Sequence, residues 1–360
     1  MAGLYIHIPF CRKKCPYCDF ISFSKYNENI INTYLSRLLL EIDYRLDNDF
    51  IDTIYIGGGT PSVIPLKIFQ NFLANLQKKI GNNIVEFTAE VNPESFSKEL
   101  LFLLIDYGVN RISMGVQSFE DDVLIFLGRL HSSRIAKKNI ELIDKFFGLN
   151  RLNIDLMYNI PLVPPGKIFS TFKLTAMYNI PHISAYSYSV NNNYLDYFSD
   201  SFSEQMNNII ALLVKNNYEQ YEISNFCKNS AISVHNIKYW LMDDYIGVGV
   251  GAHSMINCDG KRIRIANTGN LYKYMEDPIN NKSIDVIKGS EMLKEDIIFG
   301  LRYLRGLNIE HYSKQSTFKP ILCKIMNLVK EGYINYNKNN IKLSYKGILY
   351  NNYCSYKLWE

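Results

Sequence analysis

The sequence predicts an α/β protein in which repeated strand–helix units form a parallel sheet, followed by a smaller helical, winged-helix-like region. Three observations predict this class. Over residues 1–190, short apolar runs that end in Gly, Pro, Asn or Ser alternate with longer amphipathic stretches. Polar residues recur where the strand-like runs end, at intervals that suit one strand–helix unit. After residue 261, two helical patterns lead into two short strand-like runs.

The expected strands are short apolar runs bounded by turn residues. They cover 4–8, 53–56, 85–91, 111–116, 152–157 and 182–190. Apolar residues at helical spacing predict the helices between them, at 28–46, 65–80, 97–107, 120–127, 133–146 and 166–178. An Asn-rich loop at 191–193 and a helix around 203–215 follow, and we place both beyond the repeated core.

The C-terminal part begins near residue 261, after the Gly-rich stretch GVGVGAHS. Its pattern predicts a helix over 290–305, a turn at RGLN, a helix over 319–331 and a hairpin around Asn337 to Asn340. One face of the first helix is apolar, so this helix packs on another part of the protein, through Leu293, Ile297, Leu301 and Leu304. We therefore expect three regions, 1–190, 191–260 and 261–360.

Polar residues stand at the ends of successive strands, and this series is the best indication of a binding site that the residues alone give. The steps between them are 27 to 38 residues. Because ligands in such folds sit at the carboxyl ends of the strands, one rim would carry all of these groups. Turns at strand ends are rich in polar residues in any protein, so no single residue of the series is strong evidence for a binding site by itself. The series is Gly59, Glu90, Gln117, Asp155 and Ser189.

Composition and charge favour a globular protein of the cytoplasm. Hydrophobic residues make up 47% and charged residues 21% of the 360 residues, and the net charge of +4 gives no strong signal for nucleic acid or anionic membranes. The N-terminus MAGLYIHIPF lacks the features of a signal peptide, and no apolar run is long enough to cross a bilayer. Seven cysteines, three of them within eight residues, do not form the pattern of a disulfide framework.

The motif CRKKCPYC places Cys11, Cys15 and Cys18 on a loop just after the first strand. Thiolates at short loop spacing can wrap an iron–sulfur cluster, and three of them leave one iron of a [4Fe-4S] cubane open to a further ligand. A zinc site, with His7 as a fourth ligand, and a redox dithiol of Cys15 and Cys18 are the alternatives.

The sequence resembles the radical-SAM family of oxygen-independent coproporphyrinogen III oxidases and their close relatives, the heme chaperones of the HemW family. The resemblance covers nearly the whole chain. It implies a radical SAM partial (β/α)6 TIM-type barrel over the first region, with cluster and S-adenosylmethionine (SAM) at the C-terminal rim. The matching segments are LYIHIPFCRKKCPYCDF, IYIGGGTPS, EVNPES, RISMGVQSF, LGRLH, NIDLMYNIP, SAYSYS and EDIIFGLRYLRGLN.

The resemblance also implies which residues bind SAM. Glu90 suits the ribose diol, and Gln117 and Arg129 suit the methionine carboxylate, since arginine offers a planar fork of donors. Tyr5 shares a strand face with His7, towards the cluster. The full set of expected SAM contacts is Tyr5, Tyr17, Gly58, Gly59, Thr60, Glu90, Gln117, Arg129, Asp155 and Ser189.

Three features resemble the chaperone branch. The oxidases have another cysteine where this chain has Phe20, and they carry a longer N-terminal segment. HNIKYW at 235–240 resembles the HNxxYW motif of the chaperones, which makes His235 the candidate heme ligand and lets Tyr239 and Trp240 pack on the porphyrin. His253 is the next candidate and Cys227 a weaker one.

The resemblance thus implies a protein that binds heme and hands it to heme-dependent apo-proteins such as respiratory enzymes, as a monomer or homodimer. The alternative interpretation is a coproporphyrinogen III oxidase-like radical SAM enzyme. Phe20 argues against it, because the oxidases have a cysteine at this position. The lysines of the winged-helix-like region suggest that it could bind nucleic acid. They are not paired with aromatic residues in a pattern on which bases could stack. We expect no nucleic-acid partner. The lysines are Lys319, Lys324, Lys330, Lys338, Lys342 and Lys346.

Overall fold

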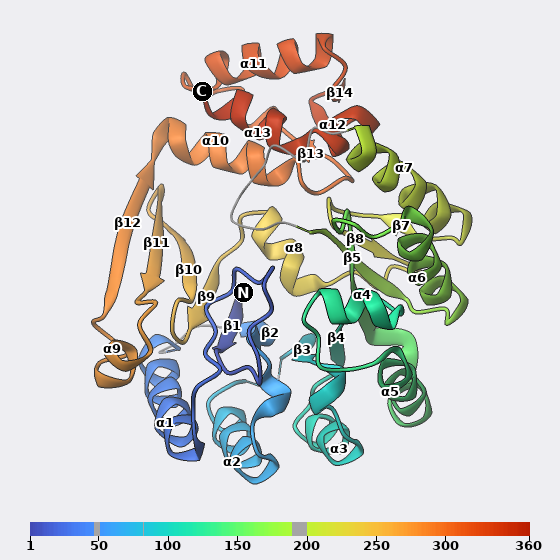
Figure 1. Ribbon diagram of the computed structural model, residues 1–360. Helices are drawn as coiled ribbons and strands as arrows, with labels where there is room; N and C mark the ends of the chain where they lie inside the picture. Colours follow the sequence, from blue (N-terminus) through green and yellow to red (C-terminus); the bar gives the residue numbers. More distant parts are fainter. Residues whose placement is uncertain (47–50, 82, 189–199) are drawn as a thin grey trace.

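The computed structural model describes residues 1–46, 51–81, 83–188 and 200–360. Its centre is a curved sheet with strand order β12-β11-β10-β9-β1-β2-β3-β4-β5-β6-β8-β7 (Figure 1). Within it, six consecutive strands run parallel, as the repeated pattern predicts. They are β1 (Ala2–Ile8), β2 (Ile51–Gly58), β3 (Glu86–Val91), β4 (Arg111–Gln117), β5 (Leu152–Tyr158) and β6 (His182–Ser187).

Helices follow these strands and cover the outer face of the curved sheet (Figure 1). Apart from α4, each places an apolar face on a continuous core of buried Ile, Leu, Val and Phe side chains, while α4 packs in a smaller cluster with Met157 and Ile160. Strands and helices agree with the expected ranges to within a few residues; of the expected last strand, 189 and 190 lie outside the described residues. The helices are α1 (Glu28–Arg45), α2 (Leu66–Gln77), α3 (Lys98–Asp106), α4 (Asp121–Phe126), α5 (Ser133–Phe146), α6 (Pro165–Met177) and α7 (Asp200–Lys215).

The sheet extends beyond the parallel strands at both edges. At one edge β8 (Asn225–Cys227) and β7 (Glu219–Gln220) pair antiparallel to β6. At the other, β9 (Tyr245–Val248) runs parallel to β1, and β10 (His253–Cys258), β11 (Lys261–Asn267) and β12 (Lys282–Lys288) form an antiparallel meander. The expected boundary at residue 261 would cut the β10–β11 hairpin, so we propose that the boundary lies after Lys288.

A second hydrophobic core belongs to the C-terminal region, which packs above the sheet in Figure 1. The expected first helix was too long: α10 ends at Gly300, and the chain turns so that the Leu304 amide donates to Tyr221 O at 2.9 Å. A three-stranded antiparallel sheet forms the wing. The elements are α10 (Gly289–Gly300), β13 (Leu307–Asn308), α11 (Phe318–Lys330), β14 (Ile334–Asn337), β15 (Asn340–Leu343), α12 (Tyr345–Leu349) and α13 (Asn351–Trp359).

Helix α8 (Val234–Trp240) connects the parallel sheet to this second core. Lys238 Nζ donates to Asp52 Oδ2 at 3.0 Å and to Met1 O at 3.2 Å, which holds the helix beneath the starts of β1 and β2. Trp240 lies under the Arg302 guanidinium, with 4.4 Å from Arg302 Cζ to the ring centroid. Thus α8, which carries the HNIKYW motif, braces two parts of the chain against each other.

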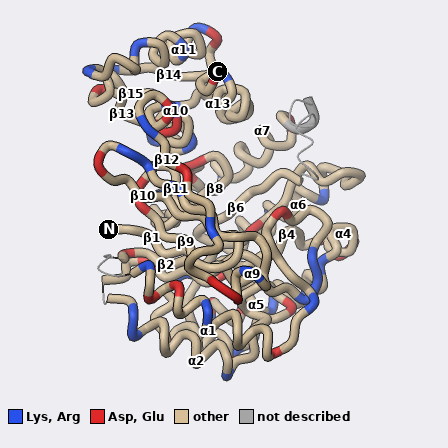
Figure 2. The backbone as a smooth tube through the Cα atoms, turned by 90° about the vertical axis from the view of Figure 1, so that its left-hand side faces the viewer, with Lys and Arg blue, Asp and Glu red and all other residues tan. Residues whose placement is uncertain are grey.

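Charged residues are dispersed over the molecule. Figure 2 shows Lys and Arg positions interspersed with Asp and Glu along the helices and strands. Among the described residues, no helix combines the length and apolarity needed to cross a membrane.

Candidate functional site

One cavity of about 590 Å³ opens at the carboxyl ends of the parallel strands and reaches down between them. Its walls are the inward-facing positions of β3 to β6, which alternate with buried apolar positions along each strand. The loop that carries the three cysteines closes its upper side. Most of the residues expected at one rim therefore line one cavity: Cys11, Cys15, Tyr17, Cys18, Gly58, Gly59, Thr60, Glu90, Gln117, Arg129 and Asp155.

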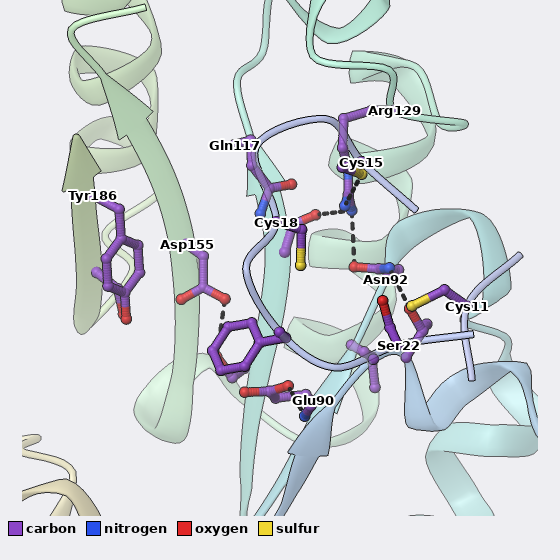
Figure 3. A pocket seen from close by; sticks show the side chains of 18 of the residues that line it. Cys11, Cys15, Cys18, Ser22, Glu90, Asn92, Gln117, Arg129, Asp155 and Tyr186 are labelled. Carbon is purple, nitrogen blue, oxygen red and sulfur yellow. Dashed lines mark hydrogen bonds between the residues drawn. The ribbon is translucent and has the colours of Figure 1, made fainter. Parts of the chain in front are cut away.

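The cysteine loop is fixed at its base to the end of β1. The Cys11 amide donates to Phe23 O at 3.1 Å, and the Phe23 amide donates to Pro9 O at 2.7 Å. A turn in which the Cys18 amide donates to Cys15 O at 3.1 Å directs the other two thiols to the same cavity (Figure 3). Backbone hydrogen bonds between the residues before and after the loop thus hold it in place, in addition to the turn within the loop.

This donor set fits a [4Fe-4S] cluster with one open iron. Three thiols and no imidazole line the cavity beside the loop, because His7 turns away: its Nε2 contacts Ile21 O at 2.8 Å and its Nδ1 contacts Tyr5 Oη at 2.9 Å. Burial raises the pKa of the Cys18 thiol, and the neighbouring Cys11 and Cys15 add to this rise. Within the described ranges no group of Cys, His, Asp or Glu side chains is gathered tightly enough to hold a single metal ion.

A chain of polar contacts joins two of the three sulfurs. Thr60 Oγ1 donates to Cys11 Sγ at 3.5 Å, and Asn92 Nδ2 donates to Thr60 Oγ1 at 2.8 Å. Arg129 then donates through Nη2 to Asn92 Oδ1 at 2.8 Å and to Gly115 O at 2.7 Å, and through Nη1 to Cys15 Sγ at 3.8 Å (Figure 3). A positive guanidinium beside a thiolate stabilises the charged form of the sulfur.

The three glycines that end β2 are required by packing as well as by any ligand. Gly58 has a φ of 111°, and a Cβ there would lie 2.4 Å from the His7 ring. A Cβ at Gly57 would lie 2.7 Å from Glu90 Cδ, and one at Gly59 2.8 Å from Phe10 O. The stretch therefore lets Glu90 and the cysteine loop approach the β2 backbone.

Two half-buried carboxyl groups line the cavity. Glu90 accepts from Tyr55 Oη at 2.7 Å and from the Gly58 amide at 2.9 Å, and burial raises its pKa to about 7. Asp155 accepts from Asn153 Nδ2 at 2.8 Å and from Ser113 Oγ at 3.3 Å, and burial also raises its pKa. Both carboxyl groups keep free lone pairs that can accept further hydrogen bonds from a ligand.

Gln117, Tyr17 and Tyr5 occupy different positions around the cavity. Gln117 has a φ of 64°, and its Oε1 is buried without a partner among the described residues. Tyr17 lines the cavity from the cysteine loop. Tyr5 does not line it: it lies in β1 behind the Tyr55 ring, with 6.1 Å between the ring centroids. Ser189 lies outside the described residues.

The structure does not bring His235 to the cavity. It is 1% exposed, its Nδ1 contacts Thr53 Oγ1 at 2.9 Å, and its Nε2 contacts Tyr239 Oη at 2.8 Å. Burial, together with the charge of Lys238, lowers its pKa to about 3. With both ring nitrogens engaged inside the protein, neither is presented to heme iron.

The other residues that were expected to contact heme differ in their exposure to solvent. Tyr239 packs edge-on against Tyr245 at 4.6 Å between ring centroids, and Trp240 lies against Arg302, so each ring already has a partner within the protein. Cys227 is buried in β8. His253, in contrast, is exposed at the start of β10.

Several residues that line the cavity were not predicted from the sequence. Asn92 resembles a turn residue before Pro93, although its side chain lies at the centre of the contacts between the cysteines. Strict alternation from Glu90, Gln117 and Asp155 would have found half of the others. These are Tyr55, Thr88, Asn92, Arg111, Ser113, Asn153, His182, Ser184 and Tyr186.

Comparisons with known proteins give the context of this site. A family model for the Radical SAM superfamily matches residues 5–169. Heme chaperone HemW of Escherichia coli (strain K12) is 34% identical, with 76% of this chain and 75% of that protein covered. Heme chaperone HemW of Lactococcus lactis is 29% identical, with 95% and 93% covered. The solved structure of coproporphyrinogen III oxidase (HemN) from Escherichia coli matches with a TM-score of 0.83 at 22% identity, covering 99% of this chain and 89% of that one.

Proposed function

Because the chain belongs to the HemW family of heme chaperones and has the radical SAM fold, we propose that it binds heme and delivers it to heme-dependent proteins such as respiratory enzymes. The observation that carries the proposal is the 34% identity to the heme chaperone of Escherichia coli over three quarters of both chains. Phe20, which stands where the related oxidases have a further cysteine, supports the same branch.

The radical SAM fold implies that a [4Fe-4S] cluster and SAM bind to it. Cys11, Cys15 and Cys18 would hold the cluster, because their thiols face one cavity and leave one iron without a protein ligand. When bound, the pair supplies reductive cleavage of SAM to a 5′-deoxyadenosyl radical. The chain itself contributes the shape of the site and the exclusion of water.

The side chains of the cavity would position SAM along its length. Gln117 and Arg129 lie beside the cysteines, where Arg129 Nε and Gln117 Oε1 have no partner among the described residues and suit the polar groups of the methionine moiety. Glu90 and Asp155 lie deeper, where a ribose diol can donate to the free lone pairs of a carboxylate. Two hydrogen bonds already hold Glu90 in this orientation.

We propose His253, and not His235, as the residue that ligates heme. His253 is exposed and follows the Gly-rich turn after β9, which packs against the cysteine loop: a Cβ at Gly251 would lie 2.3 Å from Ile21 Cδ1. Phe20, 60% exposed, precedes Ile21 and offers an aromatic surface at the cavity mouth. An accessible imidazole is a suitable axial ligand for heme iron.

The test is a heme titration of the protein after anaerobic reconstitution with iron and sulfide. We expect stoichiometric binding, seen as a Soret band, and transfer of the bound heme to an apo-cytochrome on mixing. His253→Ala should shift the Soret band, and added imidazole should restore it. His311→Ala, which removes another exposed histidine, is the matched control. Absence of stoichiometric heme binding by the wild-type protein would refute the proposed function.

A radical SAM enzyme acting on a porphyrinogen is the second candidate. The polar cavity, with a half-buried Glu90 whose pKa is raised to about 7, is the observation that favours it, since such a group can exchange a proton near neutral pH. Formation of decarboxylated product from coproporphyrinogen III, in the presence of SAM and a reductant, would establish the enzyme. We expect no such product.

A further inference from the structure

The lower half of the lumen is polar, although barrel interiors are ordinarily filled by branched apolar side chains. Pairing between neighbouring strands places Thr88 beside Arg111, and Asn153 beside both Ser113 and His182. The inward residues nearer the carboxyl ends of these strands include the groups that we propose for SAM. The floor of the cavity is lined by Thr88, Arg111, Asn153 and His182, with Ser233 and Asn236 from the start of α8.

Arg111 brings a positive charge to this floor, and it is 3% exposed. Its Nη1 donates to the carbonyls of Ala231 at 3.3 Å and Ile232 at 3.4 Å. Its Nη2 has no partner among the described residues, and Arg111 forms no ion pair with them. A buried guanidinium without a carboxylate is costly, because its charge and one of its donors are left uncompensated.

Thr88 provides a second unpaired group at the same level. It is fully buried, its Oγ1 has no partner among the described residues, and it stands opposite Arg111 in the β3–β4 register. Both residues line the same cavity from adjacent strands, whose backbones lie about 4.8 Å apart. Together they form a pair of donors that can serve one acceptor group.

The remaining polar groups of the floor are already engaged. The Glu86 carboxylate accepts from the amides of Val234 at 3.0 Å and His235 at 2.9 Å, at the start of α8. His182 contacts Asn153 through Nδ1 at 2.6 Å and Tyr221 through Nε2 at 2.7 Å. Burial and then the charge of Arg111 hold the pKa of His182 well below its usual value, so His182 stays neutral.

We propose that Arg111 and Thr88 form a carboxylate-binding subsite at the floor of the lumen, beneath the SAM position. The carboxylate would accept from Arg111 Nη2 and from Thr88 Oγ1, and its charge would compensate the guanidinium, whose Nη2 has no partner among the described residues. Its source is either a free small organic acid or a propionate group of heme. The subsite goes beyond the proposed function and does not depend on it.

The first experiment uses propionate as the probe on the full-length protein. Carboxyl-labelled ¹³C propionate is titrated at constant ionic strength and followed by NMR line broadening, with chloride as the competing anion. We expect Arg111→Met to weaken binding at least about tenfold, since a charge-assisted contact is lost. Thr88→Val should weaken it about fivefold, since one neutral hydrogen bond is lost.

Thr88→Val keeps the inference falsifiable if Arg111→Met fails to fold, because Thr88 makes no contact that braces the chain at residues 231 and 232. Arg305→Met is the matched control: it removes a surface guanidinium that pairs with Glu219 at 3.0 Å, and it should leave propionate binding unchanged. The subsite is refuted if the wild-type protein does not bind propionate, or if Thr88→Val and Arg111→Met bind it as tightly as wild type.

Heme and its dimethyl ester distinguish the two sources of the carboxylate. If the acid is a heme propionate, the ester binds more weakly than heme to wild type and equally to Arg111→Met. If it is a free small acid, heme and ester bind wild type equally while the propionate result stands. Failure of the protein to bind heme at all would refute the proposed function and leave the propionate titration intact.

Discussion

Asn92 Oδ1 accepts a hydrogen bond from Arg129 Nη2 at 2.8 Å, on the side of the cavity that faces the cysteines. The same amide donates to Thr60, which in turn donates to Cys11 Sγ. One short side chain therefore orients the groups that contact two of the expected cluster ligands. Hydrogen bonds to cluster sulfurs and their outer supports tune the reduction potential of such clusters.

We predict that Asn92→Ala lowers the reduction potential of the reconstituted cluster by about 20–40 mV. The reason is that Thr60 and Arg129 lose their common partner, which weakens contacts worth about 1 kcal/mol that stabilise the more negative, reduced state. A redox titration followed by the EPR signal of the reduced cluster measures this shift.

Asn75→Ala is the control for the Asn92 variant, since Asn75 is exposed on α2 and its side chain only donates to Asn71 O. It should leave the potential at the wild-type value. An Asn92→Ala protein with normal iron content and an unshifted potential would show that the contact is merely structural.

Substitution of any one of the three loop cysteines by serine should abolish the cluster. Iron and sulfide content after reconstitution should fall more than about tenfold in Cys15→Ser, because thiolate ligation is lost at a position that no other described cysteine can reach. Cys323→Ser, on the exposed side of α11, should retain full content. Binding of one zinc ion per chain in place of iron would support the zinc alternative.

The sequence predicted the fold well because the repeated strand–helix units are encoded locally. Each strand is a short apolar run and each helix carries one apolar face, so both could be recognised without knowledge of their neighbours. We propose a boundary after Lys288 in place of the one expected at residue 261, because β11 and β12 pair with the sheet edge, a relationship that their own composition does not reveal.

The site was predicted less completely than the fold, for a related reason. Glu90, Gln117 and Asp155 were predicted as site residues from their positions at the ends of strands, and all three line the cavity. The partners of His235 could not be foreseen: Thr53, which occupies its Nδ1, is 182 positions away. A motif shows which side chains are available, and only the folded chain shows which of them are already in use.

The stability of the protein without cofactors should fall as the pH rises from about 4.5 to about 7, in part because of Glu90. Burial raises the pKa of Glu90 from 4.5 to about 7 in the folded state, so the folded protein binds the proton more tightly than the unfolded chain. The stabilising protonation is complete below pH 4.5 and is lost above pH 7.

Glu90→Gln should remove this contribution. The free energy of unfolding of Glu90→Gln relative to wild type should increase by up to about 3 kcal/mol between pH 4.5 and pH 8, measured by urea denaturation. Glu276→Gln, at an exposed carboxylate on α9 (Leu271–Glu276), should show no such change. An equal difference at both pH values would mean that Glu90 is ionised to the same extent in the folded and unfolded chains.

His235→Ala should destabilise the protein without removing the axial ligand of heme. Its imidazole contacts Thr53 and Tyr239 in the interior, so the substitution leaves two buried hydroxyls unpaired and opens a cavity. We expect a loss of about 2–4 kcal/mol in the free energy of unfolding, measured by urea denaturation. At a temperature where the variant is folded, its Soret band should coincide with that of wild type, whereas the band of His253→Ala should shift. A folded His235→Ala protein that loses its heme spectrum, with recovery on addition of imidazole, would instead mean that α8 opens on heme binding and that the buried histidine is the ligand after all.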